Sequence, residues 1–291
     1  MINGDDFGLT SGVNRAIIQA HQHGVVTSAT LMAGGHALPE ALTLLRSAPG
    51  LATGCHVVLV NGTPVLPASQ ISTVVEGGAQ PAPRFHSKLG RFAVQALRGQ
   101  FNATEFEQEA TAQIRQLQNS GITVTHIDTH KHTHIFPAVL APLLRAATAC
   151  GVYAIRNPFA PVHVLAPAIL VSRPQLWKRY LQVKLLRRFH PAFMREVRKA
   201  GLVTTEGTVG IEATGTLDQQ LFNAIVENLP EGTWEFVCHP GYNDADLSSA
   251  GTRLLASRER ELEVLTSAES RAAIARAGIQ LVSFRELAQA S

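Results

Sequence analysis

The chain has 291 residues, enough for one large domain with a closed core, and β/α barrels often reach this length as a single unit. Hydrophobic residues make up 45% of the chain and charged residues 16%, which excludes a disordered protein. The formal net charge of +3 is too small to indicate a nucleic-acid partner, and none is expected.

No sequence feature predicts export or a membrane-spanning helix. The residues before Asp5 are too few for a signal peptide, and no uncharged apolar stretch of about 18 residues occurs. The cysteines, Cys55, Cys150 and Cys238, are odd in number and far apart, so no disulfide framework is expected. These features favour a cytoplasmic location.

The predicted helices begin at recognisable caps. Ser11 is the expected N-cap of the first helix, and Gly24 ends that helix. Thr104 is the expected cap of a later helix, with Glu105 and Glu107 in its first turn, where acidic side chains are favourable. The predicted helices cover residues 11–24, 38–47, 104–120, 136–150 and 258–277.

Strands are predicted between these helices, where β-branched and apolar residues cluster. They cover residues 25–33, 51–60, 122–128, 152–157, 234–238 and 279–284. Residues 61–90 are rich in proline and glycine and indicate a long loop. The alternation implies parallel strands with helical crossovers. The predicted fold class is therefore α/β, a single TIM-like β/α barrel over residues 1–291 with a basic helical insertion at about 162–200.

Polar side chains fall where the predicted strands end, which is where such barrels carry out their chemistry. They are Asp5, Asp6, His56, Asp128, His130, Arg156 and His239. This coincidence is the main internal evidence for an active site.

Asp5 and Asp6 are adjacent carboxylates, which repel each other unless a proton or a cation lies between them. Neighbours in a regular strand point to opposite faces, so both reach one site only if the strand is already turning, as Phe7 and Gly8 suggest. One carboxylate would then bind a metal and the other would serve as a base. The alternative is a helix cap beside a solvated surface acid.

Histidines dominate the other candidates. Residues 126–134 hold four histidines and Asp128 at alternate positions, a set that suits Zn²⁺, Mn²⁺, Co²⁺ or Ni²⁺ better than Mg²⁺ alone. Not all of them can bind one ion, and a histidine-rich surface loop is the alternative. His56 lies in an apolar strand, where a lone histidine is more often a core residue than a ligand.

Three further segments carry weaker signals. His239 follows an apolar strand and precedes a turn, and Arg156 would either hold Asp5 ionised or form an ordinary salt bridge. Residues 27–32 are rich in small side chains, and only packing is assigned to them. Residues 172–199 carry nine basic residues and one acid, Glu196. This segment indicates a solvated helix face or, alternatively, a basic lid that contacts a membrane surface or an anionic substrate.

Together these motifs resemble the YdjC-like carbohydrate deacetylases, and they occur in the order of that family over nearly the whole chain. The matching segments are residues 5–9, 12–14, 26–32, 54–60, 126–132 and 238–242. Lys131 and residues 64–67 most resemble the branch associated with hopanoid lipid biosynthesis.

The resemblance implies an irregular β/α barrel with one divalent metal ion, Mg²⁺ or Zn²⁺, with Mn²⁺, Co²⁺ and Ni²⁺ as further options. It implies Asp6, His56 and His130 as the metal ligands. Asp5 would be the general base, and His239 an acid or oxyanion partner. Substrate-binding or supporting roles are implied for Asp128, His132 and Arg156.

The reaction implied by the resemblance is hydrolysis of an N-acetyl group on an amino sugar, either an oligosaccharide or a glycolipid. A metal-dependent barrel phosphoesterase, a sugar isomerase and a non-catalytic carbohydrate-binding protein remain alternatives. A glycosidase would need two carboxylates roughly 5–10 Å apart, which adjacent aspartates do not obviously provide. A homodimer and a peripheral membrane contact through residues 172–199 are further expectations.

Overall fold

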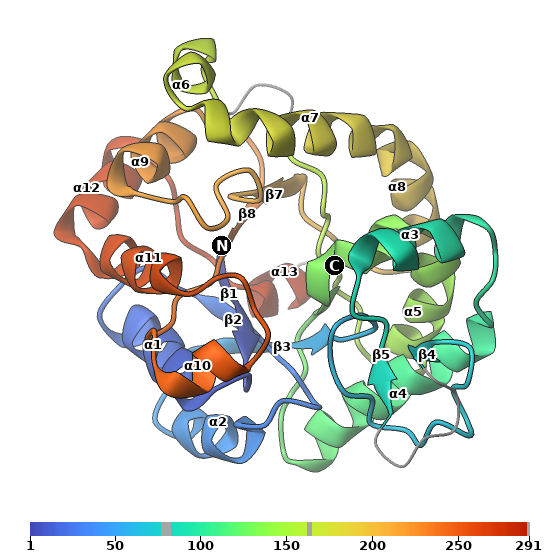
Figure 1. Ribbon diagram of the computed structural model, residues 1–291. Coiled ribbons are helices and arrows are strands. Elements are labelled where there is room, and N and C mark those ends of the chain that lie inside the picture. The colour runs from blue at the N-terminus through green and yellow to red at the C-terminus, as the bar shows by residue number, and fades with distance from the viewer. Residues whose placement is uncertain (77–82, 162–164, 290–291) are drawn as a thin grey trace.

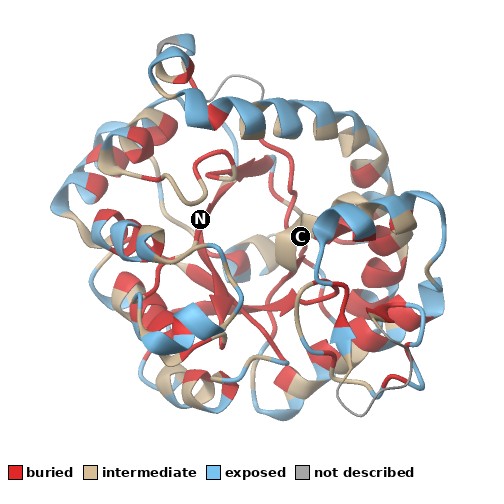
Figure 2. Cartoon of the chain, in the orientation of Figure 1, coloured by how far each residue is buried: buried red, intermediate tan, exposed pale blue. Residues whose placement is uncertain are grey.

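The computed structural model describes residues 1–76, 83–161 and 165–289. Six parallel strands form one curled sheet in the order β6-β3-β2-β1-β8-β7, and helices surround it (Figure 1). The strands are β1 (Ile2–Phe7), β2 (Ser28–Leu31), β3 (Ala52–Val57), β6 (Ile127–Thr129), β7 (Gly207–Val209) and β8 (Trp234–Cys238). Nearly all their residues are buried, because helices cover the outer face of the sheet (Figure 2).

The sheet continues past β6 through isolated parallel bridges from Ile127 to Ile155 and from Ala154 to Val203. The Thr208 backbone N–H of β7 also donates to the Phe159 carbonyl over 3.2 Å. An irregular extended segment therefore bridges the gap between β6 and β7. The predicted α/β class and irregular barrel are confirmed, whereas the strand predicted at 152–157 exists only as these two bridges.

The helices lie between successive strands and form a ring around them (Figure 1). They are α1 (Ser11–Gln22), α2 (Leu38–Leu45), α3 (Leu89–Leu97), α4 (Ala103–Asn119), α5 (Pro137–Ala149), α6 (Pro167–Ser172), α7 (Trp177–Leu186), α8 (His190–Lys199), α9 (Gln219–Glu227), α10 (Ala245–Ser249), α11 (Ala256–Thr266), α12 (Ala268–Arg276) and α13 (Phe284–Gln289). Single 3₁₀ turns lie at Pro174–Leu176 and Arg187–Phe189, and a kinked 3₁₀ stretch lies at His130–Ile135.

Two predicted helix caps are each displaced. Thr10, not Ser11, caps α1: its backbone is extended and its hydroxyl accepts the Val13 N–H over 3.3 Å. Asn102, not Thr104, caps α4, and its side-chain oxygen accepts the Thr104 N–H over 2.9 Å. In both cases the capping side chain is the one whose own backbone has not yet entered the helix.

The strand predicted at 279–284 is wrong, because side chains of the neighbouring segment hold this stretch instead of a strand ladder. The Thr27 hydroxyl donates to the Val282 carbonyl over 2.8 Å, and the Phe284 N–H donates to the Ser28 hydroxyl over 3.2 Å. The chain then enters α13 at Phe284.

The segment predicted as a loop contains regular elements, and the segment predicted as a basic helical insertion is helical. The predicted loop at 61–90 includes a short antiparallel pair, β4 (Val75–Glu76) with β5 (Arg84–Phe85), and the start of α3, while residues 77–82 lie outside the described part. The segment at 162–200 holds α6, α7 and α8, with residues 162–164 not described; its status as an insertion stays a prediction. No helix among the described residues has the length and apolar character needed to cross a bilayer.

Candidate metal centre

The chain turns sharply inside β1, and this turn brings two adjacent carboxylates to one place. The register with β2 shifts between Gly4 and Phe7, and Asp6 has a φ of 65°. A left-handed backbone is uncommon for a residue other than glycine and is typical of functional sites. Asp5 and Asp6 are both buried. The expectation that the strand is already turning at the aspartates is confirmed.

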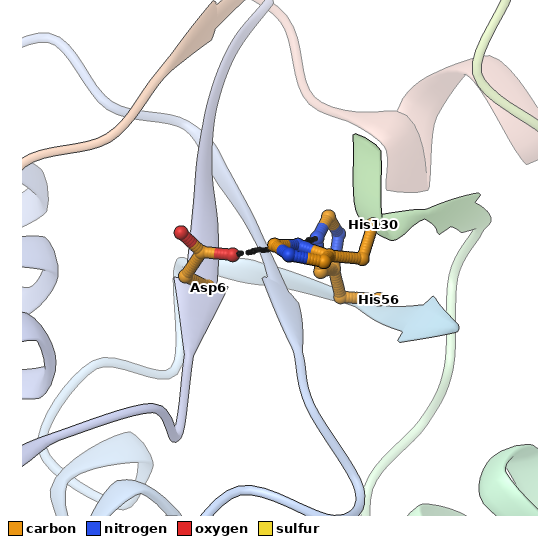
Figure 3. A group of neighbouring side chains, drawn as sticks. All are labelled: Asp6, His56 and His130. Carbon is orange, nitrogen blue, oxygen red and sulfur yellow. Dashed lines mark hydrogen bonds and ion pairs between the residues drawn. The ribbon is translucent and has the colours of Figure 1, made fainter. Parts of the chain in front are cut away.

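Asp6, His56 and His130 come from three separate elements and meet at one point (Figure 3). Asp6 Oδ1 lies 3.5 Å from His56 Nε2 and 3.3 Å from His130 Nδ1. The two ring nitrogens are 3.2 Å apart. One potential ligand atom from each residue falls within 4.8 Å of the others, a spacing that a single cation could bridge.

Asp128 fixes the orientation of the His56 ring. His56 Nδ1 donates to Asp128 Oδ1 over 2.7 Å, which leaves Nε2 facing Asp6. Burial alone would lower the pKa of His56, but the negative charge of Asp128, with Asp5 and Asp6, raises it to about 9. A carboxylate on the far ring nitrogen is the usual support of a metal-binding histidine. His56 is therefore buried like a core histidine yet arranged like a ligand.

The residues present fit a cation. Asp6 Oδ1 is buried and makes no hydrogen bond to any residue that the structure describes, although it points at two imidazole nitrogens. A buried, unpaired carboxylate oxygen is costly unless something else compensates it. A second group with similar spacing, Asp5 with His56 and Asp128, does not fit a cation, because the Arg156 guanidinium already contacts both of its carboxylates.

Arg156 is buried among three carboxylates. It makes a two-pronged contact with Asp5, at 2.8 and 2.6 Å, and contacts Asp128 at 2.5 Å and Glu235 at 2.6 Å. Burial would raise the pKa of Asp5, but the Arg156 charge outweighs it and holds that pKa below its usual range. Burial raises the pKa of Glu235, so the arginine holds Asp5 ionised in preference to it. Glu235 was not identified as a site residue from the sequence, although a lone carboxylate in an apolar strand indicates a buried, paired acid.

A second buried arginine, Arg258 of α11, holds Asp6. Its guanidinium lies 2.6 Å from Asp6 Oδ2, the oxygen that points away from the two histidines. Burial would raise the pKa of Asp6, but Arg258 and His130 hold it well below the usual range. No sequence pattern identifies Arg258 as a site residue, since it lies in a highly charged helix that suggests a solvated surface.

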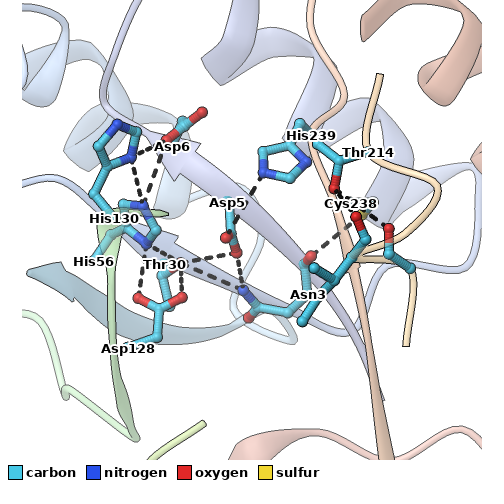
Figure 4. Close-up of polar contacts among 12 residues, drawn as sticks. Asn3, Asp5, Asp6, Thr30, His56, Asp128, His130, Thr214, Cys238 and His239 are labelled. Carbon is cyan, nitrogen blue, oxygen red and sulfur yellow. Dashed lines mark hydrogen bonds and ion pairs between the residues drawn. The ribbon is translucent and has the colours of Figure 1, made fainter. Parts of the chain in front are cut away.

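His239 follows β8 and faces Asp5 from the other side. Its Nε2 lies 3.9 Å from Asp5 Oδ2 (Figure 4). Its Nδ1 lies 4.0 Å from Glu261 Oε2. The same Glu261 carboxylate accepts the His239 backbone N–H over 2.6 Å. Glu261, also on α11, is a second buried residue that sequence reasoning missed.

The remaining histidines divide into two groups. His132 lines the cavity beside the site, and its Nδ1 is buried without a hydrogen-bond partner among the described residues. His126 and His134 are structural: His126 stacks on Phe284 at 3.7 Å, and His134 bonds to Thr129 at 2.6 Å. The backbone reverses at Lys131 and His132, with φ of 56° and 54°, so alternate positions do not face one way.

Thr30 of β2 lies between the carboxylates of Asp5 and Asp128 (Figure 4). Its hydroxyl lies 3.2 Å from Asp128 Oδ2, 3.4 Å from Asp5 Oδ1 and 3.3 Å from His56 Nδ1. Residues 27–32 were assigned to packing alone, and this position was therefore missed. The register of β2 with β1 and β3 brings Thr30 to the site.

A cavity of about 510 Å³ opens onto the site. Its volume suits a small ligand such as a short sugar. Its wall includes Asp5, Asp6, His56, His130, His132 and His239, with further side chains from α7 and from Leu89 of α3.

Comparison with known proteins places the chain in a family. Residues 1–276 match the family described as YdjC-like protein. A carbohydrate deacetylase of Geobacillus stearothermophilus is 33% identical over 98% of this chain and 96% of the relative, and a chitooligosaccharide deacetylase of Serratia marcescens is 30% identical over 99% and 98%. A crystal structure from Enterococcus faecalis V583, named a "putative cellobiose-phosphate cleavage protein", superposes with a TM-score of 0.75 at 26% identity and covers 99% of this chain and 97% of its own. The chain therefore belongs to the YdjC-like protein family.

Proposed function

We propose that this protein is a metal-dependent carbohydrate deacetylase that hydrolyses the N-acetyl group of an amino sugar. Relatives that match almost the whole chain carry the names carbohydrate deacetylase and chitooligosaccharide deacetylase. The observation that carries the proposal is the unpaired Asp6 Oδ1, which faces His56 and His130 beside a carboxylate held ionised by Arg156.

Asp6, His56 and His130 would hold one divalent ion. When bound, such an ion supplies Lewis-acid chemistry, because it acidifies water and polarises an acyl carbonyl. Two imidazoles and one carboxylate suit Zn²⁺, Mn²⁺, Co²⁺ or Ni²⁺ better than Mg²⁺. Three protein ligands leave positions open for water and substrate, as a catalytic site requires.

Asp5 would act as the general base. It is ionised because of Arg156 and lines the cavity, so it is available to accept a proton from the attacking water. His239 lines the same cavity and faces Asp5. There it would stabilise the developing oxyanion or protonate the leaving amine as the amide C–N bond breaks. Asp128 would orient His56, and Arg156 would orient Asp5.

The substrate would be an acetylated amino sugar, in an oligosaccharide or a glycolipid. Its acetyl group would enter beside Asp5 and His239, with the sugar against the cavity wall near His132 and Leu89. The free Nδ1 of His132 is a suitable hydrogen-bonding group for a sugar hydroxyl.

The test is acetate release from chitooligosaccharides, with and without a chelator, together with the metal content of the protein. His56→Ala and His130→Ala are expected to lose both the bound metal and the activity, whereas His36→Ala, an exposed residue outside the cavity, should change neither. Stoichiometric metal in both ligand variants would refute the ligand set. Activity that survives complete chelation would refute metal dependence, and activity only on phosphate esters or free sugars would favour a phosphoesterase or an isomerase.

A further inference from the structure

Exposed apolar side chains are concentrated on one part of the molecule. Among the described residues, the exposed large apolar side chains are Leu89, Val94, Leu97, Tyr153, Val171, Trp177, Leu181 and Leu185. All but Tyr153 belong to α3 or to the stretch from α6 to α7. Scattered exposed apolar residues need no explanation, but a concentration of them marks an interaction surface.

Helix α7 has no buried residue, and it is largely pale blue in Figure 2. Trp177, Leu181 and Leu185 are spaced four residues apart, so they lie along one side of the helix. They are 42%, 56% and 58% exposed. Trp177 contacts the ring of Tyr180 on the same helix edge-on, with 6.2 Å between the ring centroids, and the stripe otherwise faces solvent.

Basic side chains accompany the apolar ones on both helices. On α7, Lys178 and Lys184 are exposed, and Arg188 follows one turn later. On α3, Arg91 is exposed, and Lys88 immediately precedes the helix. Neither helix contains an acidic residue, although the partly exposed Glu76 carboxylate accepts the Ser87 N–H just before α3.

The two helices also border the candidate active site. Leu89 of α3 and the α7 side chains Arg179, Gln182, Val183 and Leu186 line the cavity. The α7 residues that line the cavity are therefore different from the exposed apolar ones. One side of α7 forms the cavity wall, while Trp177, Leu181 and Leu185 face solvent.

We propose that this surface, defined by the exposed residues of α3 and α7 and called the rim face, docks on an anionic lipid bilayer. Tryptophan and leucine mixed with lysine and arginine, without acids, are the composition of helices that lie at a bilayer surface. A protein partner is less favoured, because protein interfaces are depleted of lysine, whereas Lys88, Lys178 and Lys184 are exposed on the rim face. Docking through the rim face would hold the cavity next to the lipid head groups.

The apolar contribution is tested by flotation of the full chain with vesicles. Vesicles of phosphatidylcholine mixed with phosphatidylglycerol should bind the protein at low salt, and vesicles of phosphatidylcholine alone should bind much less. The triple variant Trp177→Ala, Leu181→Ser, Leu185→Ser should lose binding by about tenfold or more. Tyr153→Ser removes a side chain that is 51% exposed elsewhere and should leave binding unchanged.

The charge contribution is tested with a matched pair of double variants. Lys184→Glu with Arg188→Glu should weaken binding to anionic vesicles by about tenfold or more, and binding by the native chain should fall as salt rises. Arg46→Glu with Arg285→Glu makes the same change of net charge at exposed positions outside the rim face and should have little effect.

Absence of native binding to anionic vesicles at low salt overturns the proposal, as does an equal loss in the control variants. Self-association that the triple variant abolishes, without vesicle binding, would instead assign the rim face to a second copy of the chain. Acetate release from a soluble substrate should be unchanged in all these variants, because none of the substituted residues lines the cavity. The vesicle-binding result can therefore be interpreted even if the protein does not catalyse the proposed reaction.

Discussion

Asp5 and Asp6 are neighbours in the chain and are both buried, yet their surroundings differ. Both oxygens of Asp5 contact Arg156, which it shares with Asp128 and Glu235. Asp6 gives only Oδ2 to Arg258 and leaves Oδ1 without a hydrogen bond. On the Arg156 side of the site both oxygens of Asp5 have a hydrogen-bond partner. On the Arg258 side, called the open side, one oxygen of Asp6 has none among the described residues.

This difference shows how two identical side chains can take different roles. The turn at Asp6 sends it toward the histidines, while Asp5 stays with the arginine. A carboxylate paired with an arginine is held in one orientation and is ionised before the reaction, whereas an oxygen without a hydrogen bond is available to a ligand. The following experiments test that division.

Asp5→Asn is expected to have the largest effect on catalysis. The amide keeps the shape of the side chain but cannot accept the proton, so turnover should fall by about 10³-fold. Metal content should be unchanged, because Asp5 is outside the ligand set. Acetate release and elemental analysis of the same preparation measure both quantities. Near-normal turnover would show that Asp5 is not the base.

Arg156→Met is expected to have the largest effect on stability. The change leaves Asp5, Asp128 and Glu235 buried without their counter-charge, and breaking such a group typically costs about 3–5 kcal/mol. Urea unfolding measures the loss. A midpoint close to that of the native protein would show that the carboxylates are protonated or solvated instead of paired.

Arg258→Met is the matched change on the open side, and its main effect should be on metal binding. Loss of the residue that orients a ligand usually weakens metal affinity by about 10–100-fold. Saturating metal should restore much of the turnover of Arg258→Met but not that of Asp5→Asn. Metal titration of the apo protein by calorimetry provides the affinity, and an unchanged value would remove Arg258 from the supporting role.

The pH dependence of metal binding should follow His56. Its pKa of about 9 without metal means that a proton competes with the ion below that pH. Affinity should therefore fall by about tenfold for each pH unit below 9. Asp128→Asn removes the main charge that raises the pKa of His56, so its affinity should level off at a lower pH. A flat profile for the native protein would contradict this assignment.

Thr30→Val should have the smallest effect. The hydroxyl connects the Arg156 side with His56, and its loss should cost about 1 kcal/mol of unfolding free energy. Thr30→Ser retains the hydroxyl and is the control. Equal stability of the two variants would show that the contact is not a stabilising one.

Local patterns were sufficient to predict much of the fold. The strand at Trp234–Cys238 has the predicted bounds, and α1, α2 and α4 begin within a few residues of their predicted starts. Failures occurred where tertiary contacts decide the outcome. Residues 279–284 are held by the hydroxyls of Thr27 and Ser28 from a segment more than 250 residues away, and no local pattern records that.

The site was predictable by residue type at strand ends but not in its supporting groups. Asp6, His56 and His130 are recognisable because carboxylates and imidazoles are rare where apolar strands end. Arg258 and Glu261 lie in a run of charged residues on α11, which has the composition of a solvated helix. Both are buried only because that helix packs against the site, and packing of that kind is set by the whole barrel.

The left-handed backbone at residue 6 limits which side chains could replace Asp6 in the proposed metal site. Asparagine accepts that conformation more readily than most residues, whereas a cysteine there would add backbone strain of about 1–3 kcal/mol. His56 lies in a regular strand, where the backbone imposes no such restriction. Substitutions that favour a softer metal ion should therefore be tolerated better at residue 56 than at residue 6.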